Sequence, residues 1–77
     1  MEAPKREFTP REREVIHHAA TGKGTKEIAA ALNISPNTAA VHLREVYSAL
    51  GISGSGAGRR LALWAAQNGF GQNGETR

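Results

Sequence analysis

Apolar residues recur at helical spacing along most of the 77-residue chain, and glycine or proline residues separate these stretches. The pattern predicts four helices, over residues 10–21, 25–32, 36–50 and 59–68. Between the last two lies the stretch 52–58, with three glycines and two serines, which predicts a flexible loop. The charged residues 1–7 are interpreted as a mobile lead-in, and residues 71–77 as a disordered tail. The chain is therefore expected to be an all-α, four-helix domain.

The start of the first helix carries a capping box. Thr9 suits the N-cap, Pro10 the first helical position, and Glu12 the position from which a carboxylate reaches back to the N-cap amide. Gly22 provides the left-handed residue that ends the helix.

The stretch 25–51 predicts two helices joined at a tight corner. Either Gly24 or Thr25 can cap the first, and Asn33 can end it in the left-handed conformation. Ser35 is a strong N-cap residue, and Pro36 fits the position after it. A short helix, a turn of three or four residues and a longer helix form the helix-turn-helix pattern, whose second helix lies in the DNA major groove.

The predicted helix 36–50 has two distinct faces. Its inward stripe comprises Ala39, His42, Leu43, Val46 and Leu50. The opposite face, which is available to a ligand, comprises Asn37, Ala40, Val41, Arg44 and Ser48.

Composition narrows the class of function. A formal charge of +3 and a pI near 10.0 are compatible with a polyanionic partner. There is no cysteine, and the three histidines lack the spacing of a metal site, so no metal or cofactor is expected. No apolar run is long enough for a membrane span and no signal peptide is recognised, so a cytoplasmic location without membrane association is expected.

In this order and spacing, five sequence blocks resemble the DNA-binding domain of the LuxR/FixJ/GerE-type regulators. The blocks are FTPREREVI from Phe8, KEIA from Lys26, ISP from Ile34, VH from Val41 and LGI from Leu50. The resemblance covers residues 8–70. It implies a four-helix module of a bacterial transcription regulator that acts at the nucleoid. In such a module the third helix reads the major groove and the fourth dimerises. RNA polymerase or a partner regulator is a further candidate partner.

The candidate contacts follow from helix position and residue chemistry. Arg44 suits bidentate contact with guanine, and Val41 suits a thymine methyl group. Thr38 and Asn37 can donate to phosphate or cap the helix locally, and Lys26 can bind phosphate or remain solvated. The full set of candidate DNA-contacting residues is Lys26, Ser35, Asn37, Thr38, Ala40, Val41 and Arg44.

Two features of the sequence bear on the DNA-binding hypothesis: the low charge of the helix 36–50 and the apolar character of the helix 59–68. Family members often carry lysine at the place of Ala40 and basic residues at the places of Ser48 and Ala49, so the helix 36–50 has few charges here. A protein-interaction module with weak or no DNA binding therefore remains an alternative. The helix 59–68 is apolar nearly all round, so one side is expected to form a weak homodimer interface; the candidate residues are Leu61, Leu63 and Trp64.

Overall fold

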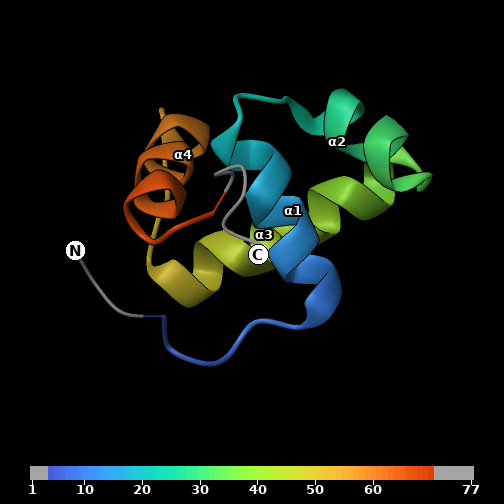
Figure 1. Ribbon diagram of the computed structural model, residues 1–77. Helices are drawn as coiled ribbons and strands as arrows, with labels where there is room; N and C mark the ends of the chain where they lie inside the picture. Colours follow the sequence, from blue (N-terminus) through green and yellow to red (C-terminus); the bar gives the residue numbers. More distant parts are fainter. Residues whose placement is uncertain (1–3, 71–77) are drawn as a thin grey trace.

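A computed structural model describes residues 4–70 of the chain, which contain no strand; the predicted tail 71–77 lies outside this range. Four helices follow one another: α1 (Pro10–Ala20), α2 (Thr25–Leu32), α3 (Pro36–Leu50) and α4 (Ala57–Gln67). In Figure 1, α1 lies between α4 and α2, and α3 runs behind α1 and α2. The all-α, four-helix prediction is confirmed. No described helix is long and apolar enough to cross a membrane.

The helix ends are set by the local signals in the sequence. Thr9 Oγ1 accepts from the Glu12 amide at 3.1 Å, and the Glu12 carboxylate accepts from the Thr9 amide at 3.0 Å, which completes the predicted capping box. The helix ends at Ala20, one residue earlier than expected, and Gly22 follows with φ of 91°. A left-handed φ of this kind favours glycine, because it has no Cβ.

The helix-turn-helix corner forms as predicted. Gly24, rather than Thr25, is the N-cap of α2, and its amide donates to Glu27 Oε1 at 2.8 Å. Asn33 ends α2 with φ of 59°, which is the left-handed conformation that asparagine tolerates better than most residues. The Ser35 hydroxyl accepts from the Thr38 amide at 3.0 Å at the start of α3, and Gly51 ends that helix.

The core is formed where α1 packs against α3 and α4, and where α2 packs against α3. Its buried residues are Val15, Ile16, Ala19, Ile28, Ala29, Ala39, Leu43, Val46, Leu50, Leu61, Trp64 and Ala65. His42, expected on the inward stripe, is only half-buried. Trp64 packs edge-on against Phe8 at 6.1 Å between ring centroids, and also contacts Phe70, so its indole is part of the core.

The segment before α1 contacts the domain at Lys5 and Arg6, within the lead-in predicted over residues 1–7; residues 1–3 lie outside the described range. The amide of Lys5 donates to the carbonyl oxygen of Ala49 at 2.8 Å. Arg6 forms a bidentate ion pair with Glu12, at 2.8 and 3.0 Å, and Glu12 is only 2% exposed. Two independent contacts therefore hold the chain from Lys5 onward against α3 and α1.

The helix α4 begins at Ala57, two residues earlier than predicted, and ends at Gln67, one residue earlier. The Arg60 side chain donates to the carbonyl oxygens of Ser53 and Ser55, so it ties the preceding loop to the first turn of the helix. The glycine-rich stretch had suggested a loosely placed helix. Instead, the Arg60 hydrogen bonds and three buried side chains (Leu61, Trp64 and Ala65) fix α4 in the domain.

Candidate nucleic-acid interface

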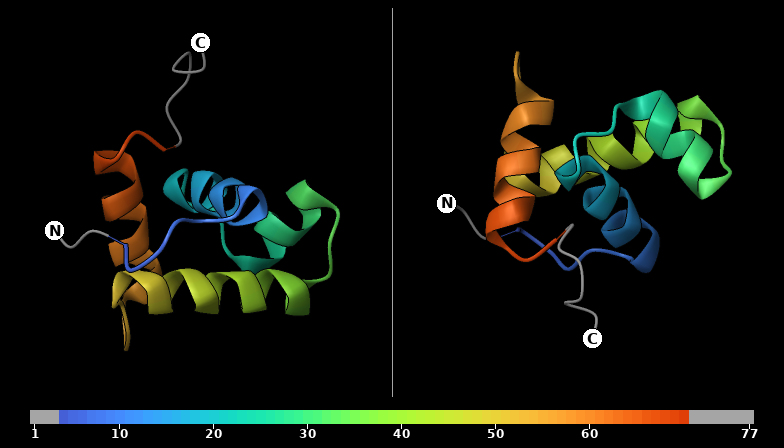
Figure 2. Two further views of the ribbon diagram at one scale, coloured as in Figure 1. Left: turned by 90° about the horizontal axis from the view of Figure 1, so that it is seen from below. Right: turned by 45° about the horizontal axis from the view of Figure 1, so that its top comes forward.

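The outer side of α3 is free of other helices. Figure 2 (left) shows α3 along one edge of the molecule, with α1 and α2 on a single side of it. Asn37, Arg44 and Ser48 are exposed on this helix, and Val41 is 42% exposed. Ala40 lies among them but is half-buried. The structure thus brings together, on one face, the residues that the sequence placed opposite the core stripe.

The N-terminal turn of α3 contains a directed chain of hydroxyl groups. Besides capping the Thr38 amide, the Ser35 hydroxyl donates to Thr38 Oγ1 at 3.0 Å. Because its oxygen accepts this bond, the Thr38 hydroxyl keeps its own proton for an outside acceptor. A helix N-terminus also favours an anion there. Ser35 is therefore a capping residue that orients Thr38, and Thr38 is the one suited to donate to phosphate.

Arg44 and Asn37 present unused polar groups. Neither side chain has a hydrogen-bond or ion-pair partner within residues 4–70, and both are exposed. In particular, Arg44 forms no ion pair with a glutamate of the described residues. A guanidinium that lies on a protruding helix without a protein partner is available for bidentate contact with a base edge.

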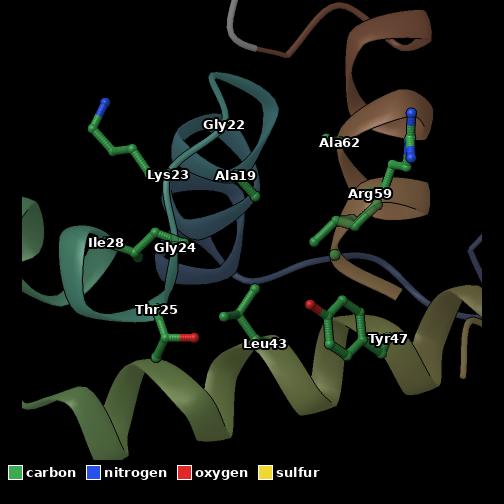
Figure 3. Close-up of a pocket in the computed structure, with 12 residues that line it drawn as sticks. Ala19, Gly22, Lys23, Gly24, Thr25, Ile28, Leu43, Tyr47, Arg59 and Ala62 are labelled. Atoms are coloured by element: carbon green, nitrogen blue, oxygen red, sulfur yellow. The ribbon is translucent and has the colours of Figure 1, made fainter. Parts of the chain in front are cut away.

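The cations beside this face come from other elements. Lys26 lies exposed in the first turn of α2, with no hydrogen-bond or ion-pair partner in the described part of the chain. Lys23, in the loop before α2, donates from Nζ to Thr21 Oγ1 at 3.2 Å. Lys26 thus places positive charge on the first helix of the helix-turn-helix, whereas the Lys23 side chain points away from α3 (Figure 3).

A pocket of about 470 Å³ opens between the α1–α2 loop, α3 and α4. In Figure 3, Leu43 and Tyr47 rise from α3 into this space, while Lys23 and Arg59 stand on opposite sides of it. Burial raises the pKa of the Tyr47 phenol above its usual value, so the hydroxyl stays protonated and can donate a hydrogen bond. Within residues 4–70 no group of three potential metal ligands occurs.

The three candidate dimerisation residues separate in the structure. Leu61 is fully buried and Trp64 is 5% exposed, because both face α1 and the core. Leu63 is 56% exposed and is the outward apolar residue of α4. Leu61 and Trp64 are therefore removed from the candidate interface, and Leu63 alone remains.

Several of these features had no sequence signal. The Arg6–Glu12 pair joins residues on a segment that looked mobile, and the attachment of Lys5 to Ala49 spans most of the domain. The role of Arg60 as a loop anchor also depends on the folded backbone. For the Arg6–Glu12 pair, the sequence offered only the capping box, which predicted that Glu12 lies at the start of α1.

Comparison with known families decides the assignment. The model of the bacterial regulatory proteins of the luxR family matches residues 6–56, which is more than half of the chain. The chain belongs to the LuxR family. Members of this family are DNA-binding regulators rather than enzymes, so the domain is of the DNA-binding transcription-regulator type. The match includes α1, α2 and α3 and ends before α4 begins at Ala57. Comparisons with curated proteins and with solved structures gave no match.

Proposed function

We propose that this LuxR-family domain binds double-stranded DNA sequence-specifically, with α3 in the major groove. The observation that carries the proposal is the free outer face of α3, on which exposed Val41 adjoins unpaired Arg44. The major groove admits an α-helix, and each base pair presents a distinct pattern of donors, acceptors and methyl groups there.

The roles on α3 follow from side-chain chemistry. Arg44 would donate two hydrogen bonds to O6 and N7 of guanine, and Val41 would contact a thymine methyl group. Asn37 lies one turn earlier, at the N-terminal end that contacts base edges in this type of motif. Ala40 has a small side chain, so the helix can approach the bases closely on that side.

The phosphate contacts would come from the surrounding elements. Thr38 donates from the start of α3, with its hydroxyl oriented by Ser35. Lys26, in the first turn of α2, has an unused ammonium group within residues 4–70. Such contacts fix the register of the protein on the duplex and carry no sequence information directly.

Two such domains would bind paired half-sites as a weak homodimer through the outward side of α4. Leu63 is the exposed large apolar residue there, and roughly 1.5–3 kcal/mol is gained when a leucine side chain is fully buried. The gain from one leucine per copy is small against the cost of association, so the isolated domain would dimerise weakly. The function places the protein at the nucleoid in the bacterial cytoplasm, where RNA polymerase or a partner regulator is a further candidate partner.

A second function is favoured by the low charge of α3. Between Pro36 and Leu50 its charged residues are Arg44 and Glu45, which cancel. Such a helix could serve a protein-interaction module that binds DNA weakly or not at all.

A binding titration separates the two functions. Fluorescence anisotropy of a duplex selected from a random pool, and of a mixed-sequence duplex, should be followed from 50 to 200 mM salt. DNA binding that weakens as the salt concentration rises supports the proposal, and no binding at 50 mM supports the interaction module. Arg44→Ala should cost about 1–3 kcal/mol on the selected duplex and relax base choice at one position.

The matched control for Arg44→Ala is Arg11→Ala. Arg11 lies on α1, where it pairs with Glu14 at 3.1 Å, and its removal changes the net charge by the same amount. If Arg44→Ala weakens the selected and mixed duplexes equally, then Arg44 contacts phosphate and the assignment to a base is wrong.

A further inference from the structure

The segment before α1 places a cation beside the C-terminal half of α3. Lys5 and Arg6 line a shallow groove of about 510 Å³ together with Glu45, Ser48 and Ala49. In Figure 2 (left), this N-terminal segment runs next to the end of α3 that is coloured yellow. The charge of Lys5 therefore lies next to α3, although the residue is far from that helix in the sequence.

The position of Lys5 is fixed through its backbone and through its neighbour. The Lys5 amide donates to Ala49 O at 2.8 Å, and Arg6 is held by both oxygens of the buried Glu12. Because Arg6 is paired with Glu12, Lys5 is the unpaired cation among residues 4–9. Its ammonium group is exposed and has no partner among residues 4–70.

The part of α3 that follows Arg44 lacks a cation of its own. After Arg44 the helix continues through Glu45 and Ser48 to Leu50 without a lysine or arginine. The N-terminal residues of a recognition helix contact the bases, so its C-terminal half approaches the edge of the groove, where the phosphates lie. Thr38 and Lys26 lie toward the other end of the interface, so α2 and α3 place no lysine or arginine beside residues 45–50.

We infer that Lys5 binds a phosphate of the DNA backbone next to the C-terminal half of α3. The inference rests on the proposed DNA-binding function and adds an element outside the helix-turn-helix to the interface. Arg6 and Glu12 are positioning residues in this arrangement, because they hold the segment without contacting the DNA. The Glu45 carboxylate lines the same groove and would repel a phosphate there. The Lys5 side chain is longer than that of Glu45, so its ammonium group can reach a phosphate beyond the carboxylate.

The experiment measures the salt dependence of binding to a mixed-sequence duplex for the wild type and for Lys5→Gln. One phosphate contact contributes about 0.9 to the slope of log affinity against log salt. If that contact contributes nothing at 1 M salt, Lys5→Gln weakens binding about 15-fold at 50 mM salt and about 4-fold at 200 mM. The loss should be the same on the selected duplex, because a phosphate contact does not read sequence.

Two further variants decide whether the effect is local. Arg11→Gln removes the same charge from α1 and should leave the slope within about 0.3 of the wild-type value. Ser48→Lys, combined with Lys5→Gln, returns a cation to the same groove from α3 and should restore the slope. Circular dichroism of each variant should match the wild type, since all three positions are exposed.

The outcomes are distinguishable. An unchanged slope in Lys5→Gln, an equal loss in Arg11→Gln, or failure of Ser48→Lys to restore the slope would each overturn the inference while leaving α3 as the recognition helix. Absence of wild-type binding at 50 mM salt would overturn the proposed function, and this inference with it.

Discussion

Replacing Glu12 by glutamine tests how the N-terminal segment is held. The Glu12 carboxylate is 2% exposed and accepts hydrogen bonds from Arg6 and from the Thr9 amide. The Arg6 hydrogen bonds lower the pKa of Glu12 from 4.5 to about 2, although burial alone would raise it. The ionised form is therefore strongly preferred in the folded domain, and Glu12→Gln removes it while retaining one carbonyl acceptor.

The free energy that the ionised Glu12 carboxylate contributes to folding follows from the shift in its pKa. Each unit of pKa corresponds to about 1.36 kcal/mol, so the ionised carboxylate contributes on the order of 3 kcal/mol at pH 7. Because the folded pKa is depressed, this stability is fully present above pH 4.5 and is lost as the pH falls through 2. The same relation leaves roughly 1 kcal/mol at pH 3 and little at pH 2.

Urea denaturation followed by circular dichroism, at several pH values from 7 to 2, measures the difference between the wild type and Glu12→Gln. The control is Glu14→Gln on the same helix, where an exposed pair with Arg11 predicts a loss within about 0.5 kcal/mol. If Glu12→Gln destabilises the domain no more than Glu14→Gln at pH 7, or if its deficit persists undiminished at pH 2, the ionised Arg6–Glu12 pair does not stabilise the fold.

Three further predictions concern the interface. The salt slope of the isolated domain should be about 2–4 per monomer, because few cations adjoin α3; a steeper slope in a proven monomer would contradict this. Leu63→Glu should abolish a dimer of micromolar or weaker affinity in sedimentation velocity, and unchanged self-association would exclude that side of α4. Ser35→Ala should lower the free energy of unfolding by about 1 kcal/mol through loss of the N-cap bond, whereas Asn37→Ala should change it by less than about 0.5 kcal/mol in the same denaturation assay.

The parts of the fold that could be predicted are those with a local cause. Ser35, Asn33 and Gly51 act within one helical turn, so the ends of α2 and α3 follow directly from the sequence. The outer face of α3 was predictable for the same reason, because helical periodicity separates Arg44 and Val41 from the core.

The parts that could not be predicted depend on contacts between distant residues. Arg6 appeared to be one of several charges in a mobile segment until the fold placed it against Glu12. The early start of α4 was missed because glycine composition favours a loop, whereas the folded loop is held by Arg60. Leu61 and Leu63 are both leucines of one short helix, and periodicity alone did not show that only the second is outward.

The distribution of charge indicates which elements would provide affinity for DNA and which would provide sequence specificity. The helix α3 is neutral overall, and its outer face exposes Asn37, Val41 and Arg44. The cations proposed for phosphate, Lys5 and Lys26, belong to separate elements that pack beside it. Sequence-independent attraction would then come from the surroundings of α3, because phosphate contacts carry no base information. Uncharged substitutions of Asn37 and Val41 should therefore change which site is preferred while leaving the salt slope nearly constant.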